Sequence, residues 1–260
     1  MTPAHSLSWA VSTDPGLRRT SNEDSYATRA DVGLFVVADG MGGHVAGEVA
    51  SRVAVEAIEA FVEETAVVDK NRTWPFPFDP SLSLEANRLK AAFRLANRRI
   101  ASAIADSQDL RGMATTASAV LIGKASASVG HVGDSRVYVL KDGALSQITH
   151  DHSWVEEQVR AGTLTPTAAR QHPWRNVVTR ALSGGDDPEV DVVEVAPAPG
   201  ERYLLCSDGL FGVVPDDRIA AILGETGVPL ENICRGLIDA ANEAGGPDNI
   251  TALVLAIDVP

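Results

Sequence analysis

The sequence predicts an α+β domain in which antiparallel sheets are covered by pairs of helices, and three observations support this fold class. Short segments rich in β-branched residues recur along the chain, as is typical of strands. Asp142-Gly143 joins two of these segments, which is a strong signal for a β-hairpin. The helical patterns lie between runs of strands rather than after every strand. This order favours antiparallel sheets over a βαβ alternation.

The predicted strands are short apolar or alternating segments bounded by polar and turn residues. In chain order they cover residues 7–12, 24–29, 33–38, 116–122, 127–132, 136–141, 144–148, 202–206 and 251–257.

Three segments show helical periodicity, over residues 48–64, 84–104 and 233–244. The apolar face of the first is expected to hold Val49, Val53, Ala57 and Ala60. That of the second is expected to hold Leu89, Ala92, Ala96 and Ile100. We expect these helices to cover the outer faces of the sheets.

The remaining segments complete a single domain over residues 1–260. Residues 70–83 contain three prolines and are predicted to form a surface loop with its aromatic side chains packed onto the domain. Residues 150–185 are polar, lie between strands, and are predicted to form a mostly helical, mobile flap.

Composition limits the functions open to the chain. The 35 acids exceed the 22 Lys and Arg residues and give a formal net charge of -13, which argues against nucleic acid as a partner. The same balance fits solubility or a cation site built from carboxylates. Two isolated cysteines, Cys206 and Cys234, suggest a reducing compartment. With neither a signal peptide nor a membrane span visible, we expect a cytoplasmic monomer that does not bind membranes.

Four acidic positions lie at the edges of apolar segments, beside glycine or turn residues. They are Glu23-Asp24 in RRTSNEDSY, Asp39 in VVADGMGG, Asp208 in LLCSDG and Asp248 in GGPDNIT. For a single Asp-Gly pair, a tight turn would be the favoured explanation. If the strands are neighbours, however, the acids meet at one edge and must either protonate or share a cation. Oxygen ligands without His or Cys favour magnesium or manganese.

Seven motifs, in order and over nearly the whole chain, carry a resemblance to a known family. They are RTSNEDS, DGMGGHVAGEVAS, GMATT, HVGDSRVY, VVTRALSG, LLCSDGLFG and GPDNIT. Together they resemble the bacterial branch of the metal-dependent (type 2C, PPM) Ser/Thr protein phosphatases. The resemblance implies a four-layer α-β-β-α sandwich, with two mostly antiparallel central sheets flanked by helix pairs.

The resemblance also implies a centre for two Mn²⁺ or Mg²⁺ ions. Asp39 would bridge the ions, and the Gly40 carbonyl would contribute to one of them. Asp208 and Asp248 would bind the other ion.

Three further residues receive roles from the resemblance. Glu23 and Asp24 would bind metal or hydrogen-bond its waters, and Arg19 would grip the substrate phosphate. A planar guanidinium suits that task because it can hold two phosphate oxygens at once. The implied reaction is in-line attack by a water that bridges the two ions, without a covalent phosphoenzyme.

Bacterial relatives often hold a third ion, which here would lie between Asp109 and Asp208, with Asp106 as a competing ligand. Ala114 stands where the family usually has glycine, and a helix-end role for Asp109 is an equal alternative. We expect His44 to pack at a helix start rather than act as an acid. Asp134 is expected to brace the adjoining turn rather than bind an ion directly.

The expected function is hydrolysis of phosphoserine and phosphothreonine in phosphorylated proteins, opposing a bacterial Ser/Thr kinase. An inactive relative that binds phosphoproteins is one alternative. A hydrolase of small phosphate esters is the other, and it would favour a closed pocket over a groove with a flap.

Overall fold

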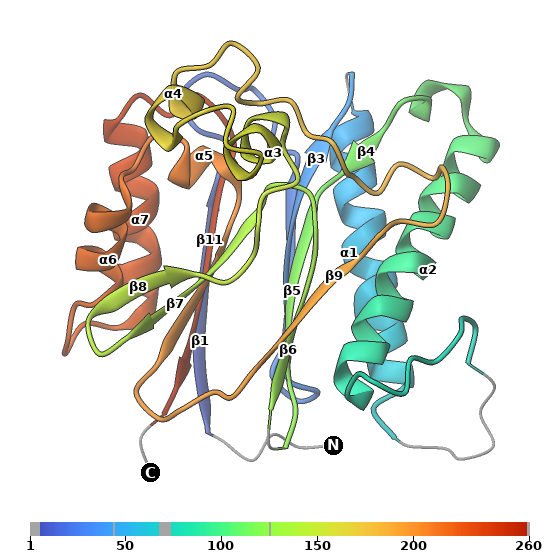
Figure 1. The fold of residues 1–260 in the computed structure, drawn as a ribbon, viewed down its shortest axis with the longest axis horizontal. Coiled ribbons are helices and arrows are strands. Elements are labelled where there is room, and N and C mark those ends of the chain that lie inside the picture. Colours follow the sequence, from blue (N-terminus) through green and yellow to red (C-terminus); the bar gives the residue numbers. More distant parts are fainter. Residues whose placement is uncertain (1–5, 44, 68–73, 125, 259–260) are drawn as a thin grey trace.

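The computed structural model describes residues 6–43, 45–67, 74–124 and 126–258. Two sheets lie face to face, and helices cover the outer face of each (Figure 1). All the strand pairs in both sheets are antiparallel. The predicted four-layer α-β-β-α sandwich is therefore confirmed.

Each sheet combines segments that are far apart in the sequence. The first has the order β1 (Leu7–Asp14), β11 (Ile250–Ile257), β10 (Arg202–Cys206), β7 (Arg136–Lys141) and β8 (Ala144–Gln147). The second has the order β2 (Asp24–Arg29), β3 (Leu34–Met41), β5 (Ala117–Ile122), β6 (Ala127–Val132) and β9 (Asp191–Val195), and β4 (Ala114–Thr115) pairs with β3. The sequence prediction lacked β4 and β9, because β4 is only two residues long and β9 is a half-exposed edge strand.

Two long helices, α1 (Ala46–Glu64) and α2 (Leu84–Asp106), pack together on the second sheet. The predicted face of α2 is confirmed, since Leu89, Ala92, Ala96 and Ile100 are all buried. The predicted face of α1 is wrong in part. Its buried stripe is centred one residue further along, at Ala50, Ala54, Ala57, Ile58 and Phe61, while Ala60 is exposed. Small alanines bring this face close to the sheet, and Val49 and Val53 pack only along its side.

The first sheet is covered by α6 (Asp216–Leu223) and α7 (Leu230–Glu243), which contact each other. The sequence prediction had named only the second of these helices. Three apolar layers result, one under each helix pair and one between the sheets. The layer between the sheets includes Phe35, Tyr203 and Leu253.

Several smaller features agree with the sequence. Phe76 is buried and Trp74 packs edge-on against Phe61, as expected for aromatic residues of a loop folded onto the domain, although Phe78 is 46% exposed. The rest of the predicted loop, residues 70–73, lies outside the described residues. Cys206 and Cys234 are both free and buried, and burial raises the pKa of each thiol.

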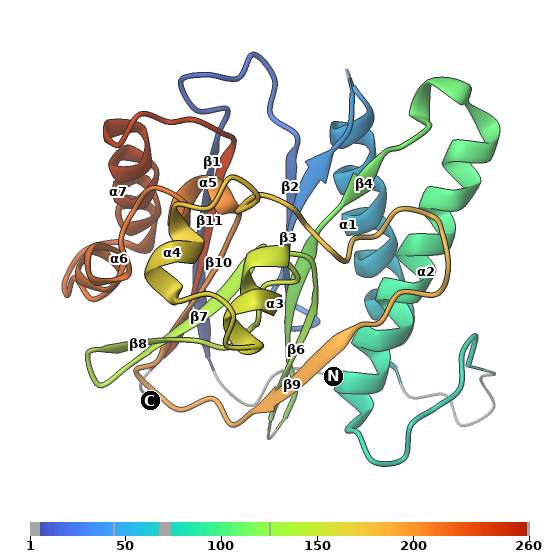
Figure 2. The same cartoon turned by 45° about the horizontal axis from the view of Figure 1, so that its top comes forward.

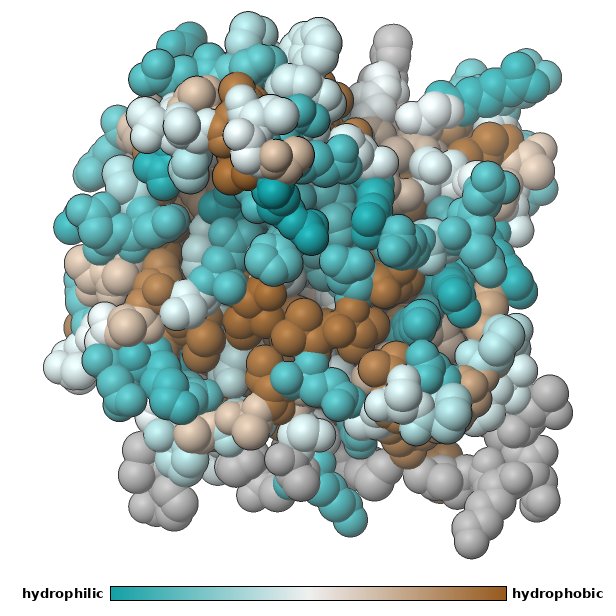
Figure 3. Space-filling model, in the orientation of Figure 1, coloured by the Kyte–Doolittle hydropathy of each residue, from teal (hydrophilic) through white to brown (hydrophobic). Residues whose placement is uncertain are grey.

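The segment over residues 150–185 lies over one end of the sandwich (Figure 2). It is less helical than predicted, with only α3 (Trp154–Arg160) and α4 (Pro166–Arg170). Its two arms are tied together where the Trp154 N–H donates to the Val177 carbonyl at 2.8 Å and the Thr179 N–H to the His152 carbonyl at 2.8 Å. On the face seen in Figure 3, hydrophobic residues form a band across the middle and hydrophilic residues gather above it. No helix among the described residues is long and apolar enough to span a membrane.

Candidate functional site

A pocket of about 270 Å³ is lined by most of the residues that the sequence predicts as a site. Its lining is made by Arg19, Glu23, Asp39, Gly40, Met41, Gly42, Thr116, Asp134, Asn176, Val178, Asp208, Asp248 and Asn249. Predicted residues from four separate motifs therefore meet in one place. Asp24 and Asp109 are not among the lining residues.

Strand ends bring the acids together. Asp39 lies near the end of β3, Asp208 begins the short helix α5 (Asp208–Phe211) just after β10, and Asp248 lies two residues before β11. Because β10 and β11 are antiparallel neighbours, the end of β10 and the start of β11 lie side by side at the same end of the sheet. Strand β3 contacts both of them from the facing sheet, which places the third acid at the same end of the sandwich.

Glycines allow these motifs to approach one another closely. A Cβ on Gly40 would collide with the Gly47 carbonyl, and a Cβ on Gly47 would collide with the Glu23 carboxylate. Gly209, next to Asp208, packs in the same way against the Asn249 carbonyl. The glycines are thus required for packing between the acid-bearing segments, a role that the sequence prediction did not assign to them.

The backbone of Asp39 is held from the neighbouring strands. Its carbonyl accepts hydrogen bonds from the Thr116 N–H at 2.9 Å and the Thr115 hydroxyl at 2.8 Å. Its N–H donates to the Thr116 hydroxyl at 3.2 Å, and that hydroxyl contacts the Ser135 hydroxyl at 2.6 Å. These bonds fix the main chain and leave the carboxylate to face the pocket.

Asp24, on the second sheet, is bonded to residues at the strand ends of the first sheet. Its Oδ2 accepts hydrogen bonds from the Ser207 hydroxyl at 2.7 Å and the Thr251 hydroxyl at 2.6 Å. Its Oδ1 is buried without a partner among the described residues. A buried carboxylate oxygen without a partner is costly, so Asp24 has one oxygen committed to structure and one available to a bound group.

Arg19 stands at the exposed rim. Its guanidinium donates to Asp248 Oδ2 at 2.8 Å, with side chains 53% and 34% exposed, respectively. This hydrogen bond to Asp248 raises the pKa of Arg19 above the ordinary value for arginine. An exposed pair of this kind adds little to stability and is readily rearranged.

Burial and mutual repulsion disfavour the charged forms of the central carboxylates. Burial, with the nearby Asp24 and Asp208 charges, holds the pKa of Asp39 well above its ordinary value. Burial and the Asp248 charge raise the pKa of Asp208 to about 6. Burial raises the pKa of Asp24 to about 7. Carboxylates in such a cluster are stabilised in their charged form by a shared cation.

Seven of the lining residues were not predicted as ligands or substrate contacts, and Asp134, Asn176 and Val178 are among them. Asp134, expected only to brace a turn, is 8% exposed and lines the pocket, and burial with the Asp208 charge raises its pKa to about 7. Asn176 and Val178 come from the flap. The GDSR motif could have drawn attention to Asp134, but no local signal marks Asn176.

The residues proposed for a third ion lie elsewhere. Asp109 is exposed in the 3-10 turn η1 (Gln108–Leu110), and Asp106 is exposed at the end of α2. Neither lines the pocket, so a role for Asp109 stays a prediction. His44 lies outside the described residues.

The donor set fits a hard divalent cation. The pocket offers carboxylate and carbonyl oxygens without His or Cys, which suits Mg²⁺ and Mn²⁺. The partnerless Oδ1 of Asp24 and the raised pKa values of Asp39 and Asp208 fit the same class of ligand. Across the described ranges, no three His, Cys, Asp or Glu side chains already form a coordination shell. Asp248 is turned toward Arg19, and Asp24 toward Ser207 and Thr251.

Comparisons with known proteins all find protein phosphatases. Residues 18–238 match the protein phosphatase 2C family. The chain is 40% identical, over 95% of its length, to the serine/threonine protein phosphatase PstP of Mycobacterium tuberculosis, and spans 44% of that protein. It is 36% identical to a putative 2C-type protein phosphatase of Streptococcus pyogenes, covering 93% of this chain and 94% of the relative.

A solved structure adds a metal to the comparison. The catalytic domain of PstP in complex with two manganese ions superposes with a TM-score of 0.80 and 36% identity. The match covers 97% of this chain and 99% of that one.

Proposed function

Because the chain belongs to the protein phosphatase 2C family, we propose that it is a metal-dependent phosphatase that hydrolyses phosphoserine and phosphothreonine in proteins. The convergence of Asp39, Asp208 and Asp248 with Arg19 in one pocket carries this proposal. Strand ends hold the acids, and an exposed guanidinium stands beside them.

Two Mn²⁺ or Mg²⁺ ions are the proposed cofactors. Asp39 is assigned to both ions, with the Gly40 carbonyl on one of them and Asp208 and Asp248 on the other. Glu23 and Asp24 are assigned to the ions or to their waters. When bound, the ions would activate a water as nucleophile and shield the negative charge of the phosphate.

Arg19 is assigned to substrate. Its side chain is 53% exposed, and among the described residues it bonds to one oxygen of Asp248 alone, which leaves its other N–H groups to hold phosphate oxygens. Asp248 sets the position of the guanidinium before substrate arrives. The network of Thr115, Thr116 and Ser135 keeps Asp39 in place while charge changes in the pocket.

The proposed activity requires phosphorylated protein substrates. We propose that its partners are phosphorylated proteins and a cognate Ser/Thr kinase whose action it reverses, and that it works in the cytoplasm as a monomer. A third ion near Asp109 would require the exposed turn η1 to move toward the pocket.

A phosphopeptide panel tests the function. With Mn²⁺ present, peptides carrying phosphoserine and phosphothreonine are expected to release phosphate. EDTA is expected to abolish turnover, and excess Mn²⁺ to restore it. Phosphate release is measured for each peptide, for the matching phosphotyrosine peptide, and for small phosphate esters.

The panel also separates the alternatives. Turnover of small esters alone would assign the pocket to small-molecule hydrolysis. Tight binding of the phosphopeptides without any turnover would assign the chain to phosphoprotein binding.

A further inference from the structure

Strand β2 forms one edge of its sheet, and its pairing with β3 determines which backbone groups point outward. The N–H and C=O of Asp39 both bond toward Thr116, away from β2. The opposed pair Asp24 and Asp39 is therefore a non-hydrogen-bonded pair of the β2–β3 ladder. The bond from the Gly40 N–H to the Glu23 carbonyl at 3.2 Å fits this alternation.

The alternation leaves a row of outward backbone groups along β2. The N–H and C=O of Tyr26 and Thr28 point away from β3, as does the Asp24 carbonyl. No described residue bonds to these groups, although the Asp24 N–H is satisfied by the Asn22 side chain at 3.1 Å. Such a row is a template for another strand unless bulges, prolines or cover protect it.

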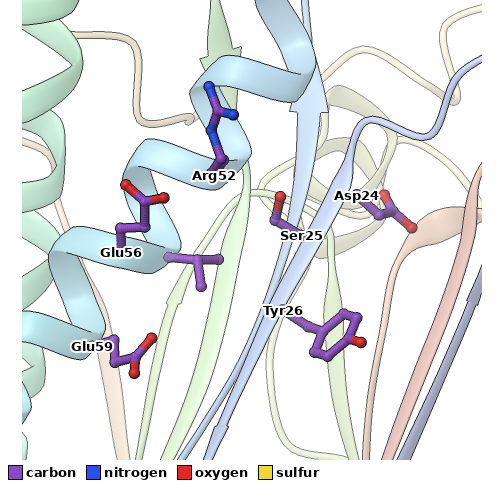
Figure 4. Close-up of a pocket in the computed structure, with 7 residues that line it drawn as sticks. Asp24, Ser25, Tyr26, Arg52, Glu56 and Glu59 are labelled. Carbon is purple, nitrogen blue, oxygen red and sulfur yellow. The ribbon is translucent and has the colours of Figure 1, made fainter.

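A groove of about 330 Å³ runs beside this edge. Arg52, Glu56 and Glu59 project from α1 on one side, and the Tyr26 ring lies on the opposite side of the strand (Figure 4). Tyr26 is 42% exposed. A strand added here would show alternate side chains to two different surfaces, one charged and one aromatic.

The charged wall carries two acids, Glu56 and Glu59, and one base, Arg52. Glu59 is already paired with Arg29 at 2.8 Å. Glu56 has no ion pair within the described residues, and the whole chain carries a formal net charge of -13. A basic segment would complement the wall next to Glu56, and the field of the protein would steer it there. Two copies paired through β2 would place like charges together, which disfavours self-association.

We propose that the free edge of β2 is a docking site for an extended, basic segment of a partner protein, which adds to the sheet as a further strand. Lys or Arg at alternate positions would face Glu56 and Glu59. The apolar residues between them would face the Tyr26 ring. Main-chain hydrogen bonds to Tyr26 and Thr28 supply the attachment, as in other cases of strand addition. The proposal does not depend on hydrolysis.

The test uses the full chain loaded with Mn²⁺ and a labelled hexapeptide of alternating Lys and Val. Fluorescence polarisation is expected to detect binding, and amide hydrogen exchange at Tyr26 and Thr28 is expected to slow at least about fivefold, which corresponds to roughly 1 kcal/mol. Peptides with Lys and Val in separate blocks, or with Glu in place of Lys, are the controls and should bind at least about fivefold more weakly.

Two variants sharpen the result. Thr28→Pro removes an outward N–H at a place where an edge strand tolerates proline, and it should abolish the exchange protection at Tyr26. Glu56→Lys should weaken binding at least about fivefold, whereas Glu231→Lys, with the same charge change at an exposed position of α7, should not. Turnover of a phosphate ester should be unchanged by Glu56→Lys.

Several outcomes would overturn the proposal. Equal binding of the block peptide, or unchanged exchange at Tyr26 and Thr28, would show that the peptide binds by charge alone. Unchanged affinity in Glu56→Lys would contradict the assigned orientation even if Thr28→Pro failed to fold. Protection at Tyr26 that rises with protein concentration, without peptide, would assign the edge to a second copy of the chain.

Discussion

Asp39→Asn is expected to lower kcat/KM for a phosphoserine peptide by a factor on the order of 10³ or more, which is about 4 kcal/mol of transition-state stabilisation. Asp39 is the carboxylate assigned to both ions, and its backbone is fixed by Thr115 and Thr116. The amide keeps the size of the side chain but removes its charge. Asp208→Asn should cause a loss of similar order. Initial rates at saturating Mn²⁺ measure both.

Asp239→Asn is the matched control for these variants. Asp239 is exposed on α7 and does not line the pocket, so its variant should keep the full rate. Circular dichroism should show that all three variants are folded. Full activity in Asp39→Asn would contradict the assignment of the metal centre.

Mn²⁺ is expected to raise the melting temperature by roughly 5–15 °C at pH 8, and by much less at pH 5. A ligand at 100 to 1,000 times its Kd stabilises a fold by about 2.7–4.1 kcal/mol, and for a chain of this size each kcal/mol is worth roughly 2–4 °C. At pH 5 protons compete for the same carboxylates, which weakens metal binding.

Without metal, the stability of the protein should fall as the pH rises, whereas the stabilisation by Mn²⁺ grows with pH. The pKa of Asp24 is raised to about 7 and that of Asp208 to about 6, from an ordinary value of 3.8. Between pH 4 and 7 the folded state therefore holds more protons than the unfolded state, so stability falls as pH rises through this window. Thermal melts in EDTA across this range measure the effect. The slope should be shallower in Asp24→Asn and unchanged in Asp239→Asn. A metal-free protein that became more stable toward pH 7 would contradict the account of the pocket.

The sequence predicted the architecture well where its signals were local. The hairpin at Asp142-Gly143 and the buried apolar strands needed only nearby residues to be recognised. Strand β9 was missed because its pairing with β6 depends on a distant segment, and its own residues are half-exposed. The face of α1 was misplaced because periodicity gives weight to Val49 and Val53. The close contact is made instead by small residues such as Ala50 and Ala54.

For the site as well, local sequence signals were predictive and contacts between distant segments were not. Motifs at strand ends placed Asp39, Asp208 and Asp248 together, and the pocket contains all three. The structural role of Asp24 between the sheets was not predicted, because its partners Ser207 and Thr251 lie far away in the sequence. Asn176 reaches the pocket only because the flap folds back over it, and the sequence carries no sign of that path.

The number of Mn²⁺ ions bound per chain tests the central claim most directly. Equilibrium dialysis of the wild-type protein, followed by metal analysis, should give at least two ions per chain. Asp39→Asn should lose binding of both, since its carboxylate is assigned to each. A wild-type chain that bound no Mn²⁺, or an Asp39→Asn variant that bound as many ions as the wild type, would contradict the metal centre.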